Sequence, residues 1–129
     1  MTPAALSDRP DGPDASCVLI VDDEDDVRES LRDVVEMMGC SAILAANGDD
    51  ALAILATRRP CLIIVDLLMP GMTGAELIVR MRREPTLSSL PVVMSTSAPE
   101  RAPRDVPLLP KPIDVDALCD WIRRACRCA

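Results

Sequence analysis

Histidine, phenylalanine and tyrosine are absent from this chain of 129 residues, and tryptophan and lysine each occur once. Without histidine, the chain lacks the commonest general base of enzymes and the usual phosphohistidine donor. One aromatic residue provides no platform on which bases could stack. The net charge of −7 at pH 7 also opposes binding to nucleic acid. We therefore expect no nucleic-acid partner and no histidine-dependent catalysis.

Long apolar runs are also missing. The longest wholly apolar stretch, Ala51–Ala56, has six residues, whereas a membrane helix needs about 18 or more. Residues 1–16 have neither a basic start nor an apolar run, so we expect no secretory signal. The length and the apolar content of 49% fit one globular domain. These features predict a cytoplasmic protein without membrane contact.

Six cysteines are present, at positions 17, 40, 61, 119, 126 and 128. They contain no CxxC pair, and no histidine is available to complete a zinc site. In a cytoplasmic protein we expect them to be reduced and mostly packed as small apolar side chains. The Cys126-x-Cys128 spacing alone is a weak metal or redox signal.

Short continuous apolar runs alternate with apolar residues at helical spacing. The runs predict strands at 18–21, 41–45, 62–65 and 92–94, and the helical spacing predicts helices beginning near positions 27, 52, 74 and 115. Continuous apolar strands need helices on both faces, which predicts an α/β fold with a parallel sheet. We expect a flavodoxin-like, doubly wound sheet of five strands in the order 2-1-3-4-5. Residues 1–16 have no periodicity, so we expect a flexible tail before a domain of residues 17–129.

The segment 97–110 is irregular and contains prolines at positions 99, 103, 107 and 110. Pro103 and Pro107 would break a helix of more than about one turn. The fourth helix should therefore be shortened or missing. Leu108-Leu109 is the only candidate for a fifth strand, and the adjacent Pro110 requires that strand to lie at the edge of the sheet.

Polar residues follow the predicted strands, where open parallel sheets bind ligands. Asp22 and Asp23 follow the first strand, Asp66 follows the third and Ser95-Thr96-Ser97 follows the fourth. Each has an ordinary alternative: acids stabilise helix N-termini, and a threonine can bond its own backbone. Three clustered carboxylates repel one another unless a cation joins them. Because oxygen ligands without nitrogen or sulfur suit hard cations, the cluster points to Mg²⁺ or Mn²⁺.

The use of basic residues is uneven, with thirteen arginines and one lysine, Lys111, after the predicted fifth strand. An ammonium is a compact point charge on a flexible stem, which suits contact with a single phosphoryl or carboxylate oxygen. The one lysine therefore indicates a specific role at this edge of the sheet.

The sequence resembles the receiver domain of two-component response regulators. Four motifs carry the resemblance, in the family's order over about residues 17–126: Val18–Glu24, Asp66–Gly74, Pro91–Thr96 and Lys111-Pro112. The resemblance implies a phosphoacceptor switch in a phosphorelay. Since no output domain follows in this sequence, it also implies a stand-alone receiver.

The resemblance further implies which residues take part in the chemistry. Asp66 would accept a phosphoryl group from a sensor histidine kinase or a phosphotransfer protein. Asp23, Asp66 and the backbone carbonyl of Leu68 would hold Mg²⁺, with Asp22 assisting through water. Phosphorylation could then create a surface for a downstream protein partner.

The same resemblance assigns the phosphoryl oxygens to three groups. They would contact the hydroxyl of Thr96, the backbone N–H of Ser97 and the ammonium of Lys111, whose bond to Pro112 is expected to be cis. The family's usually aromatic switch residue, three positions before the lysine, is Leu108 here. A leucine has neither a ring nor a hydroxyl, so the usual coupling to Thr96 cannot operate in its normal form.

Two alternatives follow from the residues. One is a receiver-like protein-interaction module that does not switch on phosphorylation, which Leu108 and the altered 97–110 segment favour. The other is an aspartyl-phosphate phosphatase, which needs a second acid two residues after the nucleophile. That position is Leu68, so we expect no enzyme, only phosphorylation from donors and slow loss of the protein's own phosphoryl group.

Overall fold

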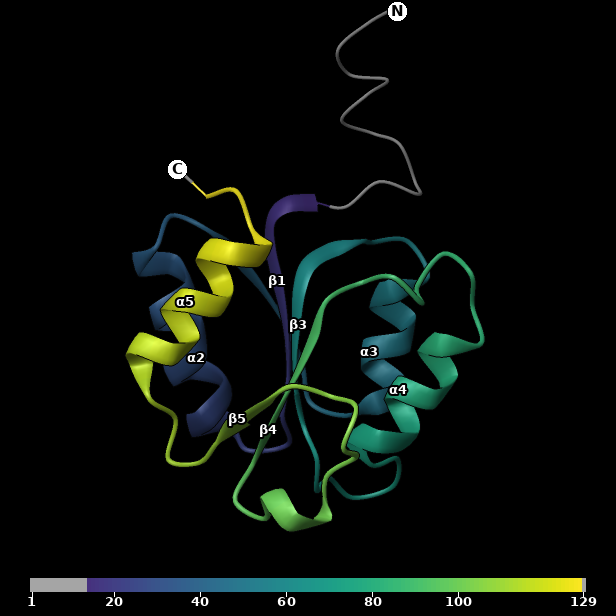
Figure 1. The fold of residues 1–129 in the computed structure, drawn as a ribbon. Coiled ribbons are helices and arrows are strands. Elements are labelled where there is room, and N and C mark those ends of the chain that lie inside the picture. Colours follow the sequence, from purple (N-terminus) through teal and green to yellow (C-terminus); the bar gives the residue numbers. More distant parts are fainter. Residues whose placement is uncertain (1–13, 129) are drawn as a thin grey trace, which may run out of the picture.

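The computed structural model describes residues 14–128, and a five-stranded parallel sheet forms its centre (Figure 1). Neighbouring strands are parallel throughout the sheet. The predicted order is confirmed as β2-β1-β3-β4-β5. The strands are β1 (Asp14–Val21), β2 (Ser41–Ala45), β3 (Pro60–Asp66), β4 (Val92–Thr96) and β5 (Leu108–Pro110).

Helices cover both faces of the sheet (Figure 1), as parallel strands require. On one face lie α2 (Asp25–Met37) and α5 (Val115–Ala125), and on the other lie α3 (Gly48–Leu55) and α4 (Gly74–Arg82). Alternate residues of β3 serve the two cores: Ile63 packs on the α3 and α4 side, whereas Leu62 packs on the α2 and α5 side. Every residue of β3 is buried, which explains its continuous apolar run. Within residues 14–128, no helix is long and apolar enough to span a membrane.

Strand β1 begins earlier than the sequence pattern predicts. Asp14 pairs with Pro60 of β3, so residues 14–16 belong to the strand and not to a tail. The backbone carbonyl of Ala15 also accepts a hydrogen bond from the N–H of Arg127, at 2.7 Å. Backbone pairing of this kind leaves no apolar pattern in the sequence. The rest of the expected tail, residues 1–13, lies outside the described residues.

The segment between β4 and β5 contains a single turn of 3₁₀ helix, η1 (Pro99–Arg101). This confirms the prediction that the helix between the fourth and fifth strands is shortened. The loop is tied to α4 by an ion pair between Arg82 and Asp105, at 2.9 Å, and Val106 is buried beneath it. Strand β5 forms the edge of the sheet, as Pro110 requires.

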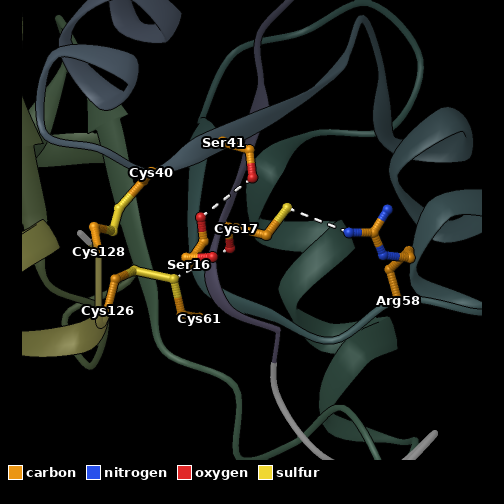
Figure 2. Close-up of a disulfide and its surroundings, with 8 residues drawn as sticks. All are labelled: Ser16, Cys17, Cys40, Ser41, Arg58, Cys61, Cys126 and Cys128. Atoms are coloured by element: carbon orange, nitrogen blue, oxygen red, sulfur yellow. Dashed lines mark hydrogen bonds between the residues drawn. A yellow bond between two sulfur atoms is a disulfide. The ribbon is translucent and has the colours of Figure 1, made fainter. Parts of the chain in front are cut away.

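The cysteines differ from the sequence prediction. Four of the six form two disulfides, Cys40–Cys128 and Cys61–Cys126, with Cα–Cα distances of 4.9 and 5.2 Å (Figure 2). The expectation that all six are reduced is therefore wrong for this structure. The partners lie 88 and 65 residues apart in sequence. Local spacing could not reveal them, because the fold brings the segment after α5 to the starts of β2 and β3.

The first residue of α4 permits a close approach to the end of β3. The N–H of Gly74 donates to the carbonyl of Leu67 at 2.9 Å. A Cβ on Gly74 would collide with the carbonyl oxygen of Asp66 and would lie 3.1 Å from the Cα of Leu67. Since these neighbours are backbone atoms, no side-chain rotation could relieve the clash. The glycine therefore fixes how closely α4 packs beside Asp66.

Gly74→Ala should lower the free energy of unfolding by roughly 2–4 kcal/mol, despite alanine's better helix propensity. Urea denaturation would measure the change. Gly71→Ala is the control: Gly71 has a φ of +77° but no atom within 4 Å of the added Cβ, so backbone strain alone should cost about 1 kcal/mol. Equal losses in the two variants would contradict the packing role of Gly74.

Candidate functional site

Three carboxylates meet at the carboxyl edge of the sheet. Asp22 directly follows β1, Asp66 is the last residue of β3, and Asp23 extends the group toward solvent. Carboxylate oxygens of the three residues lie within 4.8 Å of one another. Asp22 and Asp66 are only 1% and 5% exposed, whereas Asp23 is exposed. The cluster thus has two buried members and one member open to solvent.

Lys111 supplies the positive charge of this cluster. Its Nζ lies 3.2 Å from Oδ2 of Asp22 and 3.4 Å from Oδ1 of Asp66. Its backbone N–H donates to the carbonyl of Thr96 at 2.8 Å, which anchors the residue to the end of β4. The peptide bond to Pro112 is cis, as expected. One ammonium faces three carboxylates, so negative charge remains uncompensated.

The excess negative charge and burial change the acid–base behaviour of the site. Burial, followed by repulsion from Asp22, raises the pKa of Asp66 from 3.8 to about 6, although Lys111 opposes the shift. Burial alone would lower the pKa of Lys111, but the carboxylates of Asp22 and Asp66 outweigh it and raise that pKa above its ordinary 10.5. The carboxylate of Asp66 is thus ionised at neutral pH, but at an energetic cost that a bound cation would reduce.

Local hydrogen bonds orient Asp22. Its Oδ1 accepts from the N–H of Glu24 at 2.9 Å, and its backbone carbonyl accepts from Arg28 at 2.7 Å. Arg28 also forms an ion pair with Asp25 one turn earlier on α2. Sequence reasoning missed Arg28, because an Asp–Arg pair at i,i+3 looks like any surface helix pair.

The residues expected to contact phosphoryl oxygens lie at the same edge of the sheet but differ in burial and in hydrogen bonding. Thr96 is buried, and its hydroxyl accepts from the N–H of Ala98 at 2.9 Å. This local bond is the ordinary alternative considered for a threonine at this position. Ser97 and Leu68, which follow β4 and β3, are exposed. The structure therefore joins Lys111 to the carboxylates, whereas Thr96 is engaged with its own loop.

Leu108, at the expected switch position, begins β5 and is half-buried. It pairs in register with Met94 of β4 and packs against the core on the α3 and α4 side. Thr96 lies two residues beyond Met94, so its side chain leaves the sheet on the same face as that of Leu108. The two positions remain neighbours, but a leucine offers no hydrogen bond to Thr96.

An apolar groove adjoins the site between α2 and α5. Its volume is about 320 Å³. Lys111 and Pro112 line the end nearest the carboxylates, and Val27, Val34 and Val115 line the apolar walls. Val115 is 49% exposed, so this wall of the groove presents apolar surface to solvent.

Comparison with known proteins relates this geometry to one family. The sequence profile of the response regulator receiver domain matches residues 18–123. The chain is 33% identical to the response regulator MprA of a Mycobacterium species, over 85% of this chain and 50% of that protein. It is 37% identical to the phosphate regulon transcriptional regulatory protein PhoB of Pseudomonas aeruginosa, over 64% of this chain and 36% of that protein. The chain thus spans half or less of the length of these two relatives.

Solved structures agree with the sequence match. The chemotaxis protein CheY4 of Vibrio cholerae superposes with a TM-score of 0.76 at 28% identity, covering 85% of this chain and 98% of that chain. A CheY-like receiver domain from Methylobacillus flagellatus gives a TM-score of 0.78 at 25% identity, with the same coverage of both chains. The matched fold, the acidic cluster at the ends of β1 and β3, and the profile over residues 18–123 agree: the chain belongs to the receiver domains of two-component response regulators.

Proposed function

We propose that this receiver domain accepts a phosphoryl group on Asp66. The observation that carries the proposal is the convergence of buried Asp66 with Asp22, Asp23 and Lys111 at the carboxyl edge of the sheet. Asp66 alone in the cluster combines burial at the end of the central strand β3 with direct contact to the lysine and a raised pKa. A nucleophile that receives phosphate needs both a positive partner and positioning by rigid strands.

The transfer step is a displacement at phosphorus. A carboxylate oxygen of Asp66 attacks the phosphoryl group of a donor phosphohistidine, an O–P bond forms, and the N–P bond to the imidazole breaks. The released imidazole nitrogen takes a proton from water or keeps its electron pair. The product is an acyl phosphate on Asp66, which water hydrolyses slowly. The protein acts as a phosphoacceptor switch and not as an enzyme on external substrates.

The three carboxylates fit a divalent cation. They offer only oxygen atoms, and repulsion from Asp22, which adds to burial in raising the pKa of Asp66, is relieved by such an ion. Asp23 and Asp66 would hold Mg²⁺ or Mn²⁺ directly, with the carbonyl of Leu68 as a further ligand and Asp22 acting through water. When bound, the ion offsets the negative charge of the phosphoryl oxygens.

The remaining residues respond to the phosphoryl group after transfer. Lys111 would pair with one phosphoryl oxygen in place of its contact with Asp66, and the N–H of Ser97 would bind another. Thr96 would exchange its bond with the Ala98 N–H for a bond to the phosphoryl group. That exchange would pull the loop after β4 inward and alter the surface of residues 97–107.

The proposed partners follow from this chemistry. The donor is a sensor histidine kinase or a phosphotransfer protein, and the groove between α2 and α5 suits an apolar helical face of that donor beside Asp66. A downstream protein would recognise the altered loop. We place these events in the cytoplasm, as the composition suggests. The competing role, an interaction module that does not switch, draws its support from Leu108 and from the bond between Thr96 and Ala98.

Incubation with acetyl phosphate and Mg²⁺ should add the mass of one phosphoryl group to the intact protein. Asp66→Asn should abolish the addition, because an amide is not a nucleophile toward phosphorus. Asp50→Asn, which removes an exposed carboxylate from α3, is the matched control and should be modified like the unaltered protein. Full modification of the Asp66→Asn variant would contradict the assignment of Asp66.

The raised pKa of Asp66 predicts a pH-dependent stability difference. Because folded Asp66 binds its proton more tightly than the unfolded chain, the folded state loses stability as pH rises from about 4 to about 6. Asp66→Asn should therefore raise the free energy of unfolding at pH 7.5, without divalent cations, by about 1–3 kcal/mol. The gain should vanish near pH 4, where the carboxyl is protonated in both states.

Urea denaturation at the two pH values would measure this difference. Added Mg²⁺ should stabilise the unaltered protein at pH 7.5 and stabilise Asp66→Asn much less, since the variant lacks one ligand. An Asp66→Asn variant whose stability matches the unaltered protein at both pH values would refute the electrostatic account of the site.

A further inference from the structure

The four bridged cysteines gather at the end of the sheet opposite the carboxylate cluster. Cys40 directly precedes β2 and Cys61 is the second residue of β3, whereas Asp66 closes β3. Five residues of extended strand place Cys61 roughly 17 Å from Asp66. Cys126 and Cys128 follow α5 and reach back to these strand starts (Figure 2). The cysteines therefore form a site of their own, remote from the phosphorylation chemistry.

The two bridges hold the segment 126–128 against the body of the domain. Helix α5 ends at Ala125, and its last turn carries the exposed Arg123 and Arg124. Beyond the helix, the N–H of Arg127 bonds to the carbonyl of Ala15 in β1. The bridges add covalent links to β3 and to the residue before β2. Without the two disulfides, residues 126–128 would be held only by backbone hydrogen bonds and by their partial burial.

The two bridges differ in access. Cys61 and Cys126 are both buried, at 3% and 8% exposure, and the sulfur of Cys61 lies 3.2 Å from the carbonyl oxygen of Cys17. Cys40 is buried as well, but its partner Cys128 is half-buried. An external thiolate must reach a sulfur atom to exchange with a disulfide. The Cys40–Cys128 bridge is therefore the first that such a thiolate can attack.

We propose that residues 126–128 form a redox latch that exchanges with small disulfides and dithiols. Oxidation closes the latch: each pair of cysteine thiols transfers its two electrons to one small disulfide, giving a protein disulfide and two small thiols. Reduction by a dithiol reverses the step and releases the segment after α5. The proposed latch rests on the cytoplasmic location proposed above, where disulfides are usually transient and catalytic or redox-sensing, and a bridge with one accessible sulfur matches that behaviour.

The latch acts on the end of α5 and not on Asp66. Closing it should slow local opening of the last turn of α5 and of residues 126–128. Opening it should leave the carboxylate cluster in place, because Leu118 and Ile122 keep the rest of α5 anchored in the core. Phosphorylation of Asp66 should therefore occur in both redox states. A failure of the latch proposal and a failure of the phosphoacceptor proposal can then be told apart, because each is measured without the other.

Thiol counting tests the bridges directly. The full chain is equilibrated with oxidised glutathione, denatured and alkylated, and its intact mass is measured by mass spectrometry. We expect two alkylated cysteines of six, because Cys17 and Cys119 lie outside the bridges. Increasing dithiothreitol should yield four alkylated cysteines before six, with Cys40 and Cys128 modified first. Six alkylated cysteines in the oxidised sample, or a peptide linking Cys126 to Cys128, would overturn the proposal.

Amide hydrogen exchange tests the latch. Residues 123–128 should exchange at least tenfold faster in the reduced protein than in the oxidised protein. The melting temperature should fall by roughly 10 °C or more on reduction, because each bridge closes a long loop. Equal exchange rates in the two states would overturn the latch, even if the disulfides form.

Variants separate the latch from general thiol effects. The double variant Cys126→Ser with Cys128→Ser, which lacks both bridges, should give fast exchange of residues 123–128 under oxidising conditions. Cys119→Ser, which removes a cysteine outside the bridges, should behave like the unaltered protein. The reduced protein could instead bind one Zn²⁺ per chain and resist alkylation at all four bridge cysteines. That result would indicate a metal site and would overturn the latch proposal.

Discussion

The ion pairs of Lys111 with Asp22 and Asp66 hold the carboxyl edge of the sheet together. Two buried carboxylates at the ends of adjacent strands would repel each other strongly in the absence of a cation. The lysine reaches them from the end of the three-residue edge strand β5, and so joins three strands through one ammonium. The third carboxylate, Asp23, leaves the site short of positive charge. Burial and this shortage of positive charge together account for the raised pKa of Asp66, and the shortage supports the proposed affinity for a divalent cation.

The segment between β4 and β5, which would change conformation when the site is phosphorylated, is smaller here than in the family. Between β4 and β5, where the family has a helix, this chain has only the single 3₁₀ turn η1. The rest of that loop is joined to α4 by the ion pair between Arg82 and Asp105. Leu108 occupies the position at which the family usually has an aromatic residue, and it packs into the core. Any signal from Thr96 must therefore pass through the backbone of residues 97–107. A loop moves at lower energetic cost than a packed helix, so a small change at Thr96 could alter this surface.

Much of the fold was predictable because the signals are local. Continuous apolar runs identified β1 to β4, the prolines of the 97–110 segment predicted the shortened helix, and the polar residues at strand ends predicted the meeting of Asp22, Asp66 and Lys111. Features that depend on tertiary contacts were not predictable. The cysteine partners are brought together by the fold, and the contacts of Arg28 with Asp22 and of Gly74 with the Asp66 backbone resemble ordinary helix features in the sequence.

Titration with beryllofluoride and Mg²⁺, followed by backbone amide NMR, tests the central claim most directly. Beryllofluoride mimics a phosphoryl group on a carboxylate without a donor protein. The account predicts saturable shifts for the amides of Asp66, Thr96 and Ser97 and for the loop through residue 107, all absent in Asp66→Asn. Shifts confined to Asp66 and its neighbours, with an unchanged loop, would contradict a phosphorylation switch and favour an interaction module; no shifts at all would contradict the phosphoacceptor site itself.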